Sequence, residues 1–134
     1  MQETLECGTF ECPRPRSGGD VTVLPRVAIV HEWLSSMAGS ERVVEAMRLA
    51  FPDSHVYTSI LNEKIFAEWV PSATTSRLQR FAGSRSHEQL LPLLPAAMSA
   101  LRIRAEHDLV LRSFHSFATR PKAMLGRPEI VYCH

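Results

Sequence analysis

The chain has 134 residues, of which 45% are hydrophobic and 22% are charged, a composition that fits one ordinary domain with a buried core. Its formal net charge of +1, from 15 basic and 14 acidic residues, excludes a global electrostatic attraction to nucleic acid. The most apolar stretch, residues 90–98, contains two prolines and is far shorter than the ~20 apolar residues that a transmembrane helix needs.

Residues 1–24 are predicted to form a flexible N-terminal extension. They combine glutamates with prolines and glycines and have no apolar core, which excludes a secretory signal peptide. Cys7 and Cys12 lie in this extension, and Cys133 lies near the other end of the chain. An odd number of cysteines without the spacing of a zinc site indicates a reducing, cytoplasmic setting, with a Cys7–Cys12 disulfide left open as an alternative.

The first expected element is a buried strand. The β-branched run at 26–31 is typical of a strand in a parallel sheet. A polar turn follows at 35–40, and a helix is predicted from Glu41, with Ser40 as its N-cap and Pro52 as its stop. Four apolar residues at helical spacing mark the buried side of this helix: Val43, Val44, Met47 and Phe51.

A second strand is predicted at 56–61, which completes a strand-helix-strand unit. Residues 74–79 fit either a strand or a loop. Residues 87–103 are expected to be helical but broken or kinked, because Pro92 and Pro95 each lack a backbone N–H and clash with the preceding turn.

Two further buried strands are predicted at 108–111 and 129–133, and they lead to His115 and His134. Strands therefore alternate with helical segments along residues 25–134. This alternation predicts an α/β fold, a Rossmann-like parallel sheet with helices on both faces.

Histidines follow three of the predicted strands, and they are His31, His115 and His134. In an open parallel sheet, ligands bind outside the carboxyl ends of the strands, which all lie at one edge. A single histidine at such a position has an ordinary explanation, since an imidazole readily satisfies a loop carbonyl. Three of them at the same edge predict a polar pocket.

The turn at 35–40 lies between a strand and a helix N-terminus, where free backbone N–H groups and the helix dipole attract anions. It is therefore a candidate phosphate site, although many turns of serine and glycine act only as helix caps. The turn has neither the G-x-G-x-x-G fingerprint nor the P-loop lysine, which disfavours a dehydrogenase or flavodoxin-like module.

Six segments of the chain, in order, resemble the sequence motifs of family-four glycosyltransferases. The first, H-E-W-L-S-S-M-A-G-S-E-R-V-V-E at 31–45, resembles the family's H-D-W-L-x-G-x-x-G-G-E-K-V-L-E. The others are F-P-D-S at 51–54, T-S-R-L-Q at 75–79, L-P-L-L-P at 91–95, H-D-L-V-L-R-S-F-H at 107–115 and Y-C-H at 132–134. The resemblance covers about residues 26–134.

This resemblance implies a GT-B enzyme that transfers a sugar, with retention, from a nucleotide-diphosphate sugar to a glycan or lipid-linked acceptor. It implies no cofactor and no required metal. The chain would be the truncated N-terminal, acceptor-side domain, without the C-terminal domain that grips the donor, so the isolated fragment is expected to be inactive.

The resemblance also implies roles for individual residues. His115 would be the catalytic residue that faces the transferred sugar or the acceptor. The donor-phosphate loop would comprise Ser36, Gly39 and Ser40, and the substrate-binding residues would be His31, Glu41 and His134.

Two alternatives stay open. A Rossmann-like domain of this kind could also be a non-catalytic ligand-binding or interaction domain. The amphipathic segment 78–104 carries apolar and arginine residues, a combination that suits a peripheral contact with the inner face of the membrane or, equally, packing against the sheet.

Overall fold

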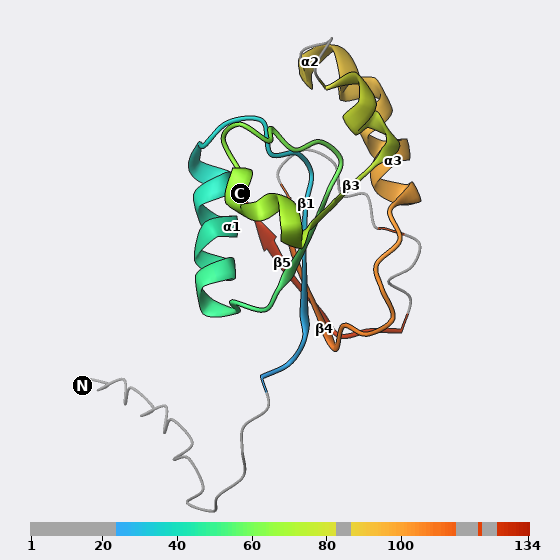
Figure 1. The fold of residues 1–134 in the computed structure, drawn as a ribbon. Coiled ribbons are helices and arrows are strands. Elements are labelled where there is room, and N and C mark those ends of the chain that lie inside the picture. The colour runs from blue at the N-terminus through green and yellow to red at the C-terminus, as the bar shows by residue number, and fades with distance from the viewer. Residues whose placement is uncertain (1–23, 83–86, 115–120, 122–125) are drawn as a thin grey trace, which may run out of the picture.

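The computed structural model describes residues 24–82, 87–114, 121 and 126–134 (Figure 1). One parallel sheet contains five strands: β1 (Val27–His31), β2 (His55–Thr58), β3 (Ala73–Thr75), β4 (Leu109–Phe114) and β5 (Glu129–Cys133). The helical elements, with η for 3₁₀-helices, are α1 (Gly39–Ala50), η1 (Ala67–Ser72), η2 (Arg77–Phe81), α2 (His87–Leu90), η3 (Leu91–Leu93) and α3 (Leu94–Ala100).

The strand order β3-β2-β1-β4-β5 is that of a doubly wound sheet. The chain first moves outward from β1 to β2 and β3, and then returns to the other side of β1 for β4 and β5. All four strand pairs are parallel. The predicted α/β class with a Rossmann-like parallel sheet is confirmed.

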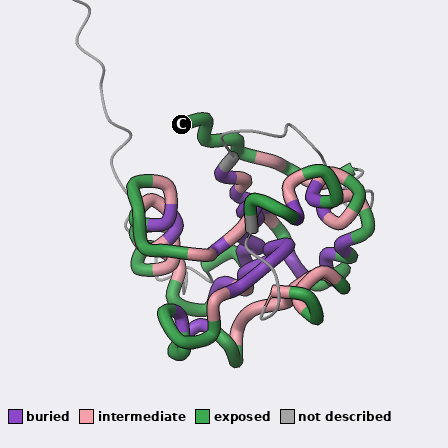
Figure 2. The backbone as a smooth tube through the Cα atoms, turned by 90° about the horizontal axis from the view of Figure 1, so that it is seen from above, coloured by how far each residue is buried: buried purple, intermediate pink, exposed green. Residues whose placement is uncertain are grey.

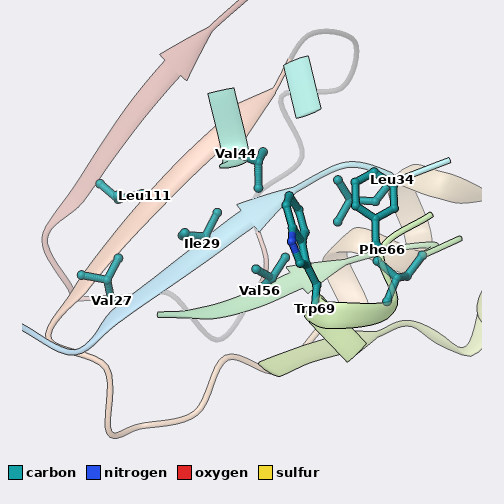
Figure 3. Packing of buried hydrophobic residues seen from close by; sticks show 9 residues of the cluster. Val27, Ile29, Leu34, Val44, Val56, Phe66, Trp69 and Leu111 are labelled. Carbon is teal, nitrogen blue, oxygen red and sulfur yellow. The ribbon is translucent and has the colours of Figure 1, made fainter. Parts of the chain in front are cut away.

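Both faces of the sheet are covered by other elements. Successive side chains of β1 point to opposite faces, and each set packs in its own apolar cluster. Val27 and Ile29 pack with Val44 of α1 and Trp69 of η1 (Figure 3). Ala28 and Val30 belong to the opposite cluster, which includes Met98, Leu101 and Ile103. Burial of each large apolar side chain contributes about 1.5–3 kcal/mol. Figure 2 shows the buried residues concentrated on the central strands.

Helix α1 begins at Gly39, two residues before the predicted start at Glu41, and the prediction of Ser40 as its N-cap is wrong. The N-cap is Ala38, which has no side-chain acceptor. Glu41 makes the other half of a capping box, because its Oε2 accepts hydrogen bonds from the N-cap N–H of Ala38 at 3.2 Å and from the Ser40 hydroxyl at 2.9 Å. The helix ends before Pro52, as predicted.

The second strand ends at Thr58, whereas the sequence predicts Leu61. The chain leaves the sheet here because the Ser59 N–H donates to the Glu32 carbonyl at 3.1 Å, and only one isolated bridge, between Leu34 and Leu61, continues the pairing. Residues 74–79 contain both of the alternatives that the sequence left open. They start in strand β3 and continue into η2.

The helical segment predicted at 87–103 is broken, as its two prolines predict. It consists of α2, η3 and α3, with Pro92 and Pro95 in the first turns of the latter two. Leu90, Leu94 and Met98 are buried in the core, whereas Phe81 and Leu93 are about half exposed. Met98 packs against the sheet with Ala28 and Val30, whereas Leu90 and Leu94 pack in a separate cluster with Ile60, which follows β2. Within the described ranges, no helix is long and apolar enough to cross a membrane.

Candidate functional site

The carboxyl ends of β1 and β4 form the point at which the sheet changes winding direction. These two strands are neighbours, and their register places His31 beside Ser113. Loops leave the two strands in opposite directions at such a point, and the crevice between them is the usual ligand site of open α/β sheets. The carboxyl ends of β1 and β4 are therefore the expected place for a ligand-binding site.

His31 and Ser113 form the buried part of a polar cluster at this edge. Both residues are fully buried, and His31 Nδ1 lies 3.2 Å from the carbonyl oxygen of Ser113 and 3.2 Å from its hydroxyl oxygen. A carbonyl oxygen can only accept, so the network assigns the proton of His31 to Nδ1. This assignment makes Nε2 the acceptor nitrogen of the neutral ring.

His134, directly after β5, completes the cluster. Its Nε2 lies 2.8 Å from the Ser113 hydroxyl oxygen. The rings of His31 and His134 stand nearly perpendicular, at 84°, with centroids 6.4 Å apart. We call His31, Ser113 and His134 the switch-point cluster, and His134 is its exposed member.

A partly buried ion pair fixes β5, and with it His134, against β4. Arg112 Nε lies 2.6 Å from Glu129 Oε1, and both side chains are only 13% exposed. The pair spans the two strands, whose register runs from Val110 opposite Glu129 to Phe114 opposite Cys133. Loss of one partner would leave a partly buried charge without its counterion, which is costly.

The predicted donor-phosphate loop lies on the same edge of the sheet, between β1 and α1. Ser36 and Gly39 are exposed, and Ser40 is half-buried. A side chain at Gly39 would meet no atom within 4 Å, so the fold itself does not require glycine there. The open space leaves the backbone of Gly39 accessible to a ligand.

Glu41, predicted to bind substrate, is almost completely buried. Its carboxylate instead accepts the two hydrogen bonds at the N-terminus of α1 described above. A negative charge already occupies the region where a phosphate would benefit from the helix dipole. A bound diphosphate at Gly39 and Ser40 would therefore have to share these donors with Glu41.

His115, the predicted catalytic residue, lies outside the described residues. The structure brings together His31 and His134 and places Ser36, Gly39 and Ser40 on the neighbouring loop. Sequence reasoning did not single out Ser113, which links the two histidines. Ser113 lies two residues after the predicted strand at 108–111, and this position after a strand is the signal that could have found it.

A second polar cluster lies near the opposite ends of the strands, and sequence reasoning missed it. Tyr57 accepts a hydrogen bond from the Arg104 N–H at 3.2 Å, and its oxygen lies 3.0 Å from His107 Nε2. His55 Nε2 lies 2.8 Å from the Thr74 hydroxyl oxygen. Burial lowers the pKa of both histidines and raises the pKa of Tyr57. We call His55, Tyr57 and His107 the tyrosine cluster.

In the part of the chain that the structure describes, no group of three or more histidine, cysteine or acidic side chains could hold a metal ion. Comparisons with models of protein families, with curated proteins and with solved structures found no match. Any function must therefore be inferred from the geometry of the site and the order of the sequence motifs.

Proposed function

We propose that this chain is the N-terminal, acceptor-side domain of a retaining GT-B glycosyltransferase, which moves a sugar from a nucleotide-diphosphate sugar to a glycan or lipid-linked acceptor. One observation carries the proposal. His31, Ser113 and His134 belong to three separate segments that resemble the family's motifs, and they meet in one hydrogen-bonded cluster at the switch point of the sheet.

The chemistry of the cluster suits a sugar substrate. His31 and Ser113 are buried and hold the exposed ring of His134 through one hydroxyl group. A ring fixed in this way can bind a sugar hydroxyl or a phosphate oxygen without losing much conformational entropy. In this proposal His134 touches the substrate, and His31 and Ser113 are positioning residues.

The loop before α1 supports a place for the donor diphosphate. The backbone at Gly39 is open, Ser40 carries a hydroxyl donor, and both lie at the start of a twelve-residue helix whose dipole favours anions. The loop follows β1, so it lies at the same edge as the switch-point cluster. We infer a reaction in the cytoplasm, at the inner face of the membrane where the acceptor is lipid-linked.

The test measures release of nucleoside diphosphate from UDP-, GDP- and ADP-sugars by the complete product of the gene that encodes this sequence. We expect release by the wild type and a fall in kcat/KM on the order of tenfold to a hundredfold for Ser113→Ala, from loss of positioning. Ser54→Ala is the matched control. Ser54 is also a buried serine, but its hydroxyl has no hydrogen-bond partner among the described residues.

Two results would contradict the proposal. The first is no release from any of these donors, and the second is equal kcat/KM for Ser113→Ala and Ser54→Ala. Ligand-observed NMR on the 134-residue chain then separates the alternatives. Binding of a nucleotide sugar without turnover by the complete product would favour a non-catalytic ligand-binding domain.

A further inference from the structure

A groove of about 1120 Å³ lies along the β3 side of the sheet, between β3, η2 and α3. None of the three residues of the switch-point cluster lines it. Strand β3 is two positions away from β1 in the sheet. The groove is therefore separate from the candidate site above, and its volume slightly exceeds the ~300–1,000 Å³ of typical ligand pockets.

The groove is apolar because of the composition of α3. The helix turns Leu94 and Met98 into the core, and its alanines at positions 96, 97 and 100 line the groove. Small side chains on this surface leave space that larger ones would fill. Leu78 of η2 and Leu93 of η3 add apolar surface to the same lining.

Two arginines, Arg77 and Arg102, are the charged residues of the lining, which contains no acidic residue. Both are exposed, and among the described residues neither forms an ion pair. Arg26 and Arg104, in contrast, each pair with a nearby carboxylate. The groove thus combines an apolar surface with cationic groups that have no counterion among the residues that the structure describes.

We propose that this groove binds a single-chain anionic amphiphile as a monomer. The hydrocarbon chain lies on the alanine and leucine surface, and the phosphate or carboxylate headgroup binds Arg77 and Arg102. Burial of the chain supplies most of the affinity, since each buried CH₂ contributes about 0.8 kcal/mol. The arginine forks supply the preference for an anion, because they match phosphate and carboxylate geometry. The inference does not depend on glycosyl transfer.

The test compares two ligands with the same chain, oleoyl lysophosphatidate and the uncharged monooleoylglycerol, both below their critical micelle concentrations. Isothermal titration calorimetry on the 134-residue chain should show lysophosphatidate binding at least about tenfold more tightly. The double variant Arg77→Gln/Arg102→Gln should lose this preference. Arg42→Gln/Arg80→Gln removes the same charge from exposed arginines that do not line the groove, and it should keep the preference.

A second pair of variants tests the apolar surface. Ala100→Phe fills the groove and should abolish binding of both ligands, whereas Ala46→Phe, on the exposed side of α1, should not. Unchanged thermal melting of each variant controls for folding. Three results would overturn the proposal: no binding of either monomer, equal binding by all variants, or association of the wild type with phosphatidylglycerol vesicles alone. The last result would indicate a membrane-surface contact instead.

Discussion

The switch-point cluster and the tyrosine cluster are built from the same kinds of side chain, two histidines and one hydroxyl group. They differ in their place along the strands. His31, Ser113 and His134 gather where β1, β4 and β5 end. The tyrosine cluster forms near the strand beginnings, since His55 is the first residue of β2 and His107 lies two residues before β4.

The two clusters also differ in access. His134 is exposed, so one end of the first cluster can meet a ligand. His107 and Tyr57 are buried, Tyr57 packs in one cluster with Met98 of α3, and the Tyr57 hydroxyl is shared between His107 and the backbone of Arg104. The same residue types can therefore serve a ligand at one end of the sheet and hold the fold together at the other. We propose that position in the sheet decides between the two roles.

The largest expected effect concerns the predicted catalytic histidine. His115→Ala in the complete gene product should lower kcat by roughly 10²–10⁴-fold, the range for loss of a group that transfers a proton or stabilises charge. The melting temperature should change little. Enzyme assays and thermal melting of the same preparation check both. A large fall in melting temperature with unchanged turnover would assign His115 to the fold instead of the chemistry.

The comparison itself is tested by substituting one histidine from each cluster. His134→Ala should lower kcat/KM on the order of a hundredfold with little change in stability, because the side chain is exposed. His107→Ala should leave kcat/KM unchanged and destabilise the fold by about 1–3 kcal/mol, since it removes a buried partner of Tyr57. Equal losses of kcat/KM and of stability in the two variants would mean that position in the sheet does not separate a ligand-binding role from a structural one.

The sequence predicts the strands and helices well where the pattern is local. The strand at 26–31 and the break at Pro92 and Pro95 need only neighbouring residues to be recognised, and both are present. The tyrosine cluster could not be found in this way, because Tyr57 and His107 are 50 residues apart and neither follows a strand. Their contact depends on how the segment between α3 and β4 packs.

Two predictions near the candidate site, the helix N-cap and the end of the second strand, are wrong because of competing hydrogen bonds. Ser40 fits the pattern of an N-cap, but the Glu41 carboxylate reaches back to the Ala38 N–H and makes the helix begin at Gly39. The β-rich run at 56–61 ends early because Ser59 donates to the Glu32 carbonyl through both its N–H and its hydroxyl. Propensity alone does not decide between such partners.

A smaller effect is expected from pH, and it concerns the tyrosine cluster. The pKa values of His55 and His107 are lowered in the folded chain, chiefly by burial, with contributions from nearby arginines and an opposing one from Glu106. The unfolded chain therefore binds more protons below its histidine pKa of about 6.5. The stabilisation is complete above that pH and is lost as the pH falls toward the folded pKa values.

Thermal melting between about pH 7.5 and 5 should show this loss, because the histidine window lies above that of carboxylates such as Asp108, whose pKa is lowered by its contact with Arg26. The variant His55→Gln/His107→Gln should have a flatter profile over the same range. A profile as steep as that of the wild type would show that other groups carry the acid sensitivity.

The smallest expected effect distinguishes two predictions about the turn before α1. Glu41 was predicted to bind substrate, and Gly39 and Ser40 were predicted to approach the donor diphosphate. Glu41→Gln keeps an acceptor for the Ala38 N–H and removes the negative charge, at a cost in stability of about 0.3–1 kcal/mol from the helix dipole. If the diphosphate binds at this helix terminus, removal of the charge should tighten nucleotide-sugar binding by about threefold at low salt, with the gain reduced at high salt. If Glu41 binds substrate directly, the same substitution should weaken binding.

Glu45→Gln, one turn further along the same helix, is the matched control for net charge and should change the affinity less in either case. Calorimetric titration of the complete gene product with UDP- and GDP-sugars at two salt concentrations measures whether the affinity rises or falls. Weaker binding by Glu41→Gln, without a change for Glu45→Gln, would indicate that the diphosphate does not bind at α1. Glu41 would then both cap the helix and contact the substrate.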